Sequence, residues 1–557
     1  MKHALDRIEV GSLEELKTKG VITVKGADRP IAVFFDQGKI HAVDNRCPHL
    51  GFPLNRGTVK DGILVCHWHH GRFDIHSGCA FDLWADDVPS FDTELADDVV
   101  YVSANPRKEL GLEYYRGRLI QGLEQNIPLV QYKSLLGLLK QKLTAEELCR
   151  ELTDWSSDHL DQWRDGMTTL SVVSRLWPKL KETTRLYAMG TASRRISQNS
   201  FGMPAPVKRP ALDNQNQTVE QLARWMKHWA LVRQRDGAER TVLTLLDSGA
   251  SQLQIAEALF GALYDRVYAN SGHLVDFTNK SLELLDVIGW DEAGRVLPML
   301  MHELTQARGE EDKGSWRDPH DLITLVKEAE EALARIHPIR KNWDGNIQDN
   351  FLETFNGEDP KQILESLIGW VEEGIPYREI GKQLCYAAAM RLAWFPESNE
   401  MGDWFFPMHT FTFTNAVYQS MRHGKSPILA RGLIQGAMSV FTDRFLSVPR
   451  ARIPEPDKSA LLLSEQDLLD LMLKSLDEKQ RWSRLPELVA TYLHNDYSRV
   501  SLVDTLAMAT LREDVDFHLI QALEAGMEQA SLWQGQAEEI HIYIGVARHL
   551  AAHCPTR

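Results

Sequence analysis

Hydrophobic positions change their spacing once along this chain, near residue 105. Before that point, short runs rich in Val, Ile and Phe alternate with Gly, Asp and Asn turns, as in VITVKGADRPIAVFFDQGKIHAV (21–43), a pattern typical of β-strands. From about residue 110, apolar residues recur at i, i+3, i+4 and i+7, as in LVQYKSLLGLLKQKL (129–143), which predicts amphipathic helices. We therefore expect a multidomain chain, with a small β domain over 1–105 and an all-helical domain over 110–557.

The helical part contains an internal repeat. Residues 258–285 and 384–421 both run from an apolar helix through an Arg and an irregular insert to a His followed by FTN, and residues 506–526 carry a shorter copy without FTN. The pattern predicts a helical solenoid or a pseudo-symmetric bundle, which the loop 201–218 would subdivide. The matched positions are Arg266 with Arg391, His273 with His409, and Phe277-Thr278-Asn279 with Phe413-Thr414-Asn415, and the shorter copy has Arg512 and His518.

Composition and charge narrow the classes of partner. The chain has 557 residues and a formal net charge of −16, which disfavours nucleic acid and anionic membranes because both would repel it. No apolar run is long enough to span a bilayer, and the N-terminus carries no export signal. Six cysteines in 557 residues are too sparse for a disulfide scaffold. We expect a cytoplasmic protein whose oligomeric state the sequence does not indicate.

Two short boxes in the β domain pair cysteine with histidine. Cys47 and His49 form C-x-H, and Cys66 and His69 form C-x-x-H after sixteen intervening residues. Two thiolates and two neutral imidazoles are the ligand set of a Rieske [2Fe–2S] centre, in which two His ligands replace two Cys ligands on one iron. A Cys₂His₂ zinc site is the alternative, but such sites normally begin with C-x₂₋₄-C. The pattern favours the iron–sulfur cluster.

Residues 5–105 resemble the Rieske family, and more closely its ferredoxin and oxygenase branch than its respiratory branch. The first box matches C-x-H-x-G-x-x-L. The second matches the run C-P-W-H-G-W-R-F-D, with His67 in the Pro position and His70 in the Gly position. The resemblance implies a small Rieske β-sandwich whose [2Fe–2S] cluster is held by Cys47, His49, Cys66 and His69. We expect Gly71 to replace the missing glycine, His67 and His70 to face solvent or support the ligands, and Cys79 to be a buried apolar residue.

The resemblance also bears on redox potential. Respiratory members carry an extra cysteine in each loop, and Ser and Tyr donors to the cluster sulfurs. Here the loop positions hold Phe52 and Trp68, and Phe73 stands in place of the Tyr. Hydrogen bonds to the sulfurs raise the potential because they stabilise the more negative reduced cluster. We expect a potential near the low end of the Rieske range, roughly −150 mV.

If the β domain carries a redox cluster, we expect the helical domain to contain the site that uses the electrons. It lacks the H-x₄-H spacing of a mononuclear iron site, and it holds a single E-x-x-H, at Glu538 and His541, where a di-iron site needs two. The repeated histidines remain as candidates. We expect them to line one cavity, where imidazoles could bind a second metal, transfer protons or contact substrate. The candidate catalytic residues are His273, Asp276, Asn279, His409 and Asn415, joined with less support by His518.

The stretches GHLVDFTNKSLELL and MHTFTFTNAVYQSM resemble questin oxidase-like, Baeyer–Villiger-type proteins, which implies oxidation of an aromatic or polyketide-like substrate. No GxGxxG fingerprint is present, so electrons should come from a separate reductase or ferredoxin. We expect an oxidoreductase of the Rieske-dependent oxygenase or monooxygenase type, with electrons entering at the His49/His69 edge of the cluster. The alternative is an electron-transfer or redox-sensing protein whose helical domain is a docking scaffold for a partner.

Overall fold

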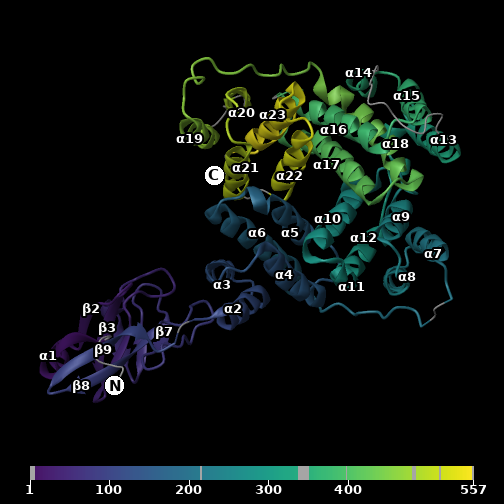
Figure 1. The fold of residues 1–557 in the computed structure, drawn as a ribbon. Coiled ribbons are helices and arrows are strands. Elements are labelled where there is room, and N and C mark those ends of the chain that lie inside the picture. Colours follow the sequence, from purple (N-terminus) through teal and green to yellow (C-terminus); the bar gives the residue numbers. More distant parts are fainter. Residues whose placement is uncertain are drawn as a thin grey trace. The chain divides into compact units, whose positions relative to one another are not determined.

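A computed structural model describes residues 7–108, 110–213, 216–336, 350–396, 398–478, 484–513 and 516–554. The chain forms two compact units, Met1–Leu143 and Thr144–Arg557. The first contains the β domain and the second contains most of the helices (Figure 1).

The β domain consists of two antiparallel sheets. The larger has six strands in the order β1-β9-β8-β4-β3-β2, and the smaller has three in the order β5-β6-β7. Short helix α1 (Leu13–Lys19) follows the first strand, with the Ser12 side chain accepting a hydrogen bond from the Glu15 amide at its start. The strands are β1 (Arg7–Ser12), β2 (Val21–Lys25), β3 (Pro30–Asp36), β4 (Lys39–Asp44), β5 (Thr58–Lys60), β6 (Ile63–Val65), β7 (Arg72–Asp74), β8 (Ser90–Ala96) and β9 (Val99–Pro106).

Strand β3 is buried on both faces, and its side chains alternate between two apolar cores. Ala32 and Phe34 face a core shared with Leu64 and Phe73 of the smaller sheet, whereas Ile31 and Val33 face a second core on the other side of the larger sheet. The alternation follows from the two-residue period of a strand. The predicted β-sandwich is confirmed, because the first core lies between the two sheets.

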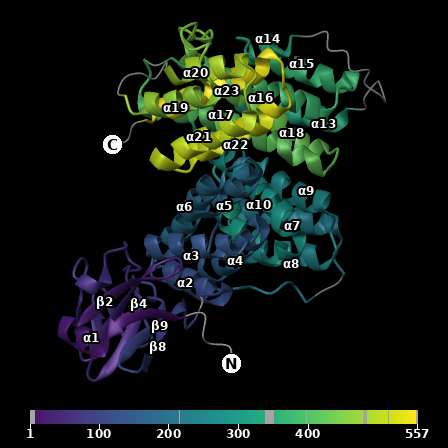
Figure 2. The ribbon, with the colours of Figure 1, turned by 60° about the vertical axis from the view of Figure 1, so that its left-hand side comes forward.

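Two helices, α2 (Leu112–Glu124) and α3 (Pro128–Lys140), complete the first unit. They lie side by side, as Figures 1 and 2 show. A side chain at Gly137 would place its Cβ 2.3 Å from the Tyr115 ring, so a glycine allows the close approach. The compact units therefore divide at 143/144, and the expected domain limits of 105 and 110 stay a prediction, as does the β-domain start at residues 1–6, which lie outside the described residues.

The second unit is helical, as the apolar periodicity predicts. Its N-terminal helix is α4 (Ala145–His159), which starts with a capping box in which Thr144 and Glu147 bond each other's backbone. The remaining helices are α5 (Asp165–Leu176), α6 (Glu182–Ser200), α7 (Val219–Val232), α8 (Arg235–Asp247), α9 (Gln252–Leu263), α10 (His273–Ile288), α11 (Ala293–Val296), α12 (Met301–Thr305), α13 (Leu322–Arg335), α14 (Phe351–Phe355), α15 (Pro360–Glu373), α16 (Tyr377–Ala393), α17 (Phe405–Ser420), α18 (Pro427–Thr442), α19 (Glu465–Leu476), α20 (Arg484–His494), α21 (Arg499–Glu513), α22 (His518–Ser531) and α23 (Ala537–Ala552).

In each of the three stretches with a matched histidine, the histidine lies near the N-terminus of a helix. Helices α10 and α22 begin at His273 and His518, and His409 lies at the fifth position of α17. Helix α17 packs against both α10 and α22. The internal repeat, and a subdivision of the unit at 201–218, stay predictions. Among the described helices, none combines the length and apolar character needed to cross a membrane.

Candidate functional site

The first cysteine–histidine box lies in the loop between β4 and β5. The amide of Cys47 donates to the carbonyl of Phe52 at 2.8 Å, and the amide of Gly51 donates to the carbonyl of Cys47 at 2.7 Å. Gly51 has φ +82°, a backbone conformation that favours glycine. The side-chain oxygen of Asn45 accepts from the Asn55 amide at 2.7 Å. These bonds close the loop and hold Cys47 and His49 on one turn.

The second box lies in the turn between β6 and β7. The Cys66 amide donates to the carbonyl of Gly71, and the His70 amide donates to the carbonyl of Cys66, at 2.8 and 2.9 Å. His70 has φ +60°. His70 thus adopts the left-handed backbone without being a glycine, and the expectation that Gly71 lets the loop pass close to the cluster stays a prediction. A Cβ at Gly71 would lie 3.3 Å from the Phe73 and Trp84 rings.

The structure brings the four predicted ligands together. Cys47 and Cys66 are buried in the core between the sheets, His49 is half-buried and His69 is exposed. The imidazole rings of His49 and His69 lie 4.7 Å apart. Nδ1 of His49 is buried and has no hydrogen-bond partner among the described residues. A buried nitrogen without a partner is costly and fits a metal ligand, so the donor set suits an iron–sulfur cluster.

Helix α3 contributes a cation to the first box. Nζ of Lys133 contacts the Pro48 carbonyl and donates to the His49 carbonyl at 2.6 Å, and it lies 3.7 Å from the Asp86 carboxylate. Burial, with the His69 and Lys133 charges, lowers the pKa of His49. Burial and the neighbouring Cys66 thiol raise the pKa of Cys47 to about 11. Lys133 therefore ties the α2–α3 hairpin to the loop of His49.

Comparisons with known proteins agree with this geometry. The sequence profile described as "Rieske [2Fe-2S] domain" matches residues 6–92. The ferredoxin component of the naphthalene 1,2-dioxygenase/salicylate 5-hydroxylase systems of Ralstonia sp. is 32% identical over 73 residues, which are 13% of this chain and 70% of that protein. The chain belongs to the Rieske family. Its Rieske domain indicates a [2Fe–2S] cluster.

Two other relatives are much longer than the matched segment. The 4beta-methylsterol monooxygenase of Methylococcus capsulatus is 45% identical over 65 residues, 12% of this chain and 17% of that protein. The human Rieske domain-containing protein is 31% identical over 81 residues, 14% of this chain and 52% of that protein. The chain thus spans from a sixth to half of these relatives, and the resemblance of its helical domain to questin oxidase-like proteins stays a prediction.

Three other positions of the Rieske domain have predicted exposures, namely His67, His70 and Cys79. His67 and His70 are exposed, as expected, and His67 contacts the Thr58 hydroxyl. The expectation that Cys79 is buried is wrong, because its side chain is exposed. It lies just past the β7 hairpin, where the Asp74 amide donates to its carbonyl, and this turn places it at the surface.

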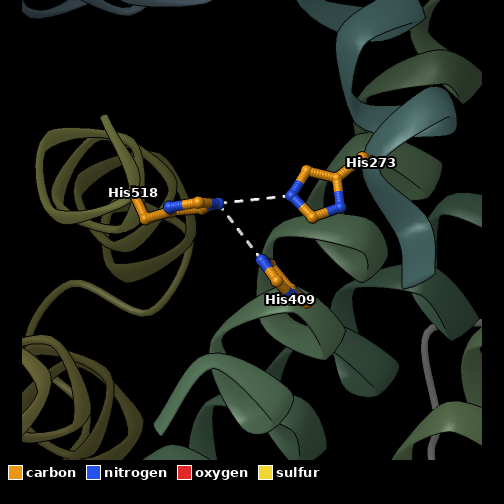
Figure 3. Close-up of side chains that lie close together, drawn as sticks. All are labelled: His273, His409 and His518. Atoms are coloured by element: carbon orange, nitrogen blue, oxygen red, sulfur yellow. Dashed lines mark hydrogen bonds between the residues drawn. The ribbon is translucent and has the colours of Figure 1, made fainter. Parts of the chain in front are cut away.

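A second constellation lies in the helical unit, where His273, His409 and His518 converge (Figure 3). Nε2 of His518 lies 3.2 Å from Nε2 of His273 and 3.2 Å from Nε2 of His409. One ring nitrogen from each histidine lies within 4.8 Å of the others. All three side chains are half-buried. The structure therefore brings the three histidines together, and the expectation that all of them line one cavity stays a prediction.

The other predicted residues lie deeper along the same helices. Asp276 contacts Gln521 of α22, and burial raises the pKa of Asp276 to about 7. The Asn279 side chain donates to Glu283 at 2.9 Å, and Asn415 accepts from Gln529 at 2.8 Å. The structure does not bring the two asparagines to the three histidines, because their amides bond to neighbouring polar side chains instead.

A cavity of about 340 Å³ adjoins His409. Aromatic side chains of Tyr268, Trp316 and Phe406 form part of its wall, and Glu310 and Asp443 add acidic groups. Burial raises the pKa of Asp443 to about 7, and its Oδ2 has no hydrogen-bond partner among the described residues. The cavity wall therefore combines aromatic side chains with Asp443, one of whose carboxylate oxygens is buried without a hydrogen-bond partner among the described residues.

Sequence reasoning missed two charged neighbours of these sites. Lys133 sits in a helix assigned to the other domain, and Asp516 precedes His518 by two positions without forming a recognised motif. The single E-x-x-H histidine lies elsewhere, since Nδ1 of His541 is 2.7 Å from the Tyr386 hydroxyl. Only the two-residue spacing of Asp516 and His518 could have been noticed from the sequence.

Proposed function

We propose that the protein is an oxidoreductase in which the Rieske cluster takes single electrons from a reductase or ferredoxin for use in a reaction at His273, His409 and His518. One observation carries the proposal. A chain with a Rieske domain also holds three converging imidazoles next to a cavity. Electrons from the cluster must reduce an acceptor. We place that reaction at the three histidines because their ring nitrogens converge on one point among the described residues of the helical unit.

In this proposal Cys47, His49, Cys66 and His69 hold the [2Fe–2S] cluster. When bound, the cluster supplies one-electron transfer. The buried cysteines hold it against the apolar core, and the exposed His69 ring provides the edge where an electron donor docks. His49 is half-buried and its ring lies 4.8 Å from the Trp84 ring, so we place electron entry at His69 rather than at both histidines.

The cavity indicates the class of substrate. Tyr268, Trp316 and Phe406 would stack on an apolar ring, and the acidic side chains of Glu310 and Asp443, which also line the cavity, would favour a hydroxyl or amine on that ring. Relatives with a Rieske domain include components of systems named for naphthalene and salicylate. We propose an aromatic substrate bearing a hydrogen-bond donor, which agrees with the aromatic or polyketide-like substrate expected from the sequence.

We also propose separate roles for the other candidate residues. Asp276 lies one helical turn below His273 and is poised to hold a proton near neutral pH, because burial raises its pKa to about 7. Asn279 and Asn415 position α10 and α17 through their bonds to Glu283 and Gln529. They would affect turnover through helix placement rather than by touching substrate.

Reoxidation of the cluster tests the proposal. Protein reduced under anaerobic conditions is mixed with oxygenated buffer, with and without hydroxylated aromatic compounds, and recovery of the oxidised Rieske absorption is timed. We expect His409→Ala to slow recovery and His541→Ala, which removes a half-buried histidine outside the site, to leave it unchanged. Equal rates in all three proteins would contradict the proposal.

The alternative is an electron carrier whose helical unit docks a partner. The Ralstonia ferredoxin component favours it, since this chain covers 70% of that carrier. A carrier would deliver its electrons to an external protein, so His409→Ala would leave both reoxidation by oxygen and reduction of the partner intact. The same kinetic experiment therefore separates the two functions.

A further inference from the structure

The three histidines of the helical unit have the spacing of metal ligands. Two imidazole nitrogens bound to one ion at about 2.0–2.1 Å with tetrahedral angles lie roughly 3.3 Å apart. The Nε2 atoms of His518 and His273, and of His518 and His409, are each 3.2 Å apart. The side chains come from three helices and point toward one another in Figure 3. The geometry is that of one small centre.

Polar groups on the far side of the rings determine which ring nitrogen faces that centre. Nδ1 of His273 lies 2.9 Å from the backbone carbonyl of Asn270, and a carbonyl can only accept, so this nitrogen carries the proton. Nδ1 of His518 lies 3.2 Å from a carboxylate oxygen of Asp516, and although these two atoms do not form a well-aligned hydrogen bond, the negative charge favours the tautomer with the proton on Nδ1. In a neutral ring Nε2 is then a bare lone pair. Two lone pairs 3.2 Å apart repel unless a cation lies between them.

We infer that His273, His409 and His518 bind one divalent first-row transition-metal ion through their Nε2 atoms. A proton on His518 could bridge only one of its two contacts, whereas a metal ion satisfies all three nitrogens. The metal site stands apart from the proposed electron relay, because the spacing and protonation of these rings hold whether or not electrons arrive.

The surroundings suit an ion with an open position. Aromatic rings of Phe277, Phe405 and Phe517 lie 4.0–5.7 Å from the nearest histidine ring of the group, which lowers the local dielectric. Asp516 supplies a negative charge behind His518, an arrangement that orients metal-bound histidines. Three protein ligands leave a position free, as catalytic rather than structural zinc sites do. His409 also lines the 340 Å³ cavity, so a bound molecule could reach that position.

The backbone before His273 is strained in a way that holds this ring. Tyr268, Asn270 and Ser271 have φ of 49°, 50° and 55°, a left-handed conformation that is unfavourable for residues other than glycine. Hydrogen bonds to residues outside this segment hold the strained backbone in place. Asn270 and Arg308 exchange two hydrogen bonds of 2.8 Å, and the Tyr268 amide donates to Gln435 at 2.9 Å. Such strain clusters at functional sites, and here it places the Asn270 carbonyl against Nδ1 of His273.

Imidazole ligands suit iron, zinc, copper and nickel, so the experiment must identify the ion. Holoprotein is analysed for these metals and for acid-labile sulfide. The cluster contributes iron and sulfide in equal amounts, so we expect metal in excess of sulfide at one ion per chain. Excess iron would assign a redox-active site and excess zinc a Lewis-acid site. Equal iron and sulfide, with no other metal bound and no uptake of Co(II), would overturn the inference.

Variants locate the ion. Chelator-treated protein is titrated with Co(II) alone and followed by its visible ligand-field spectrum. We expect His273→Ala, His409→Ala and His518→Ala each to lower Co(II) affinity by more than 10-fold, Asp516→Asn to lower it by ~10–100-fold, and His541→Ala to have no effect. Thermal melts report folding, and Asp516→Asn decides the question if an alanine variant unfolds. Unchanged affinity in folded His518→Ala and Asp516→Asn proteins would overturn the site.

The outcome is independent of the electron relay. Metal binding at these residues with unchanged reoxidation kinetics would leave the metal site standing and remove the proposed relay. Slower reoxidation in the His409→Ala protein, with no metal binding in the unsubstituted protein, would support the relay and remove the metal site.

Discussion

The Nε2 atoms of His273 and His518 lie 3.2 Å apart although 245 positions separate them in the sequence. The contact is the first of three polar layers between helices α10 and α22. Asp276 contacts Gln521 in the next layer, and Lys280 contacts Glu524 in the third. The helical period aligns the layers, because positions three or four residues apart share a face. The histidines therefore sit at the open end of a buried polar interface.

We expect the helical unit to lose much of its stability when Lys280, the cation of the third layer, is removed. Lys280 is fully buried between Glu283, at 2.8 Å, and Glu524. Lys280→Met leaves two buried carboxylates without the ammonium group that they share, and we expect it to lower the free energy of unfolding by about 3–5 kcal/mol. Denaturant titration measures the change.

A matched control is Lys361→Met, which removes an exposed pair with Glu365 and should cost less than about 1 kcal/mol. Adding Glu283→Gln and Glu524→Gln to Lys280→Met should restore much of the loss. Similar costs for Lys280→Met and Lys361→Met would show that the buried network does not stabilise the helical unit.

Buried His549 predicts sensitivity to acid. Both of its ring nitrogens lack partners among the described residues, and burial, with the charges of His553 and His518 outweighing that of Asp516, holds its pKa well below the ordinary value. Below about pH 6.5 the unfolded chain takes up a proton that the native state refuses, so stability falls by up to roughly 1.4 kcal/mol per pH unit. Above that pH this histidine makes no contribution.

We expect His549→Leu to make the fall in melting temperature between pH 6.5 and 5 less steep, without lowering stability at neutral pH. The exposed His494 provides the control, because His494→Leu should leave the pH profile unchanged. An equally steep profile in the His549→Leu protein would show that another group causes the acid sensitivity.

Lys133 predicts a shift in the redox potential. Its ammonium group donates to the His49 carbonyl at 2.6 Å, and a nearby cation stabilises the more negative reduced cluster. We expect Lys133→Met to lower the potential, measured by voltammetry of the holoprotein. Lys140→Met, an exposed lysine on the same helix, should leave it unchanged. A higher potential in Lys133→Met would mean that the lysine does not act through its charge.

Much of the Rieske domain could be predicted, because its motifs are local. Each cysteine–histidine pair lies within four residues, so a single turn brings it together. The conformation of His70 could not be predicted, since its left-handed backbone depends on how the turn closes between β6 and β7. The compact unit that ends at Leu143 also includes α2 and α3, which side chains such as Lys133 tie to the β domain, and the sequence did not indicate this contact.

The helical site was predictable only in part. The shared His and FTN pattern identified His273 and His409 as candidates. The same pattern also included two asparagines that form hydrogen bonds away from the histidines, Asn279 with Glu283 and Asn415 with Gln529. The place of Asp443 in the cavity wall follows from tertiary contacts between distant segments, whereas Asp516 lies only two positions from His518. Cytoplasmic location and the absence of a nucleic-acid partner stay predictions.

Electron paramagnetic resonance of the reduced protein tests directly whether Cys47, His49, Cys66 and His69 hold a Rieske cluster. We expect a Rieske signal that Cys47→Ser, Cys66→Ser and His69→Ala each abolish, and that His67→Ala and His70→Ala retain. A signal that survives His69→Ala and disappears in His67→Ala would contradict the assignment.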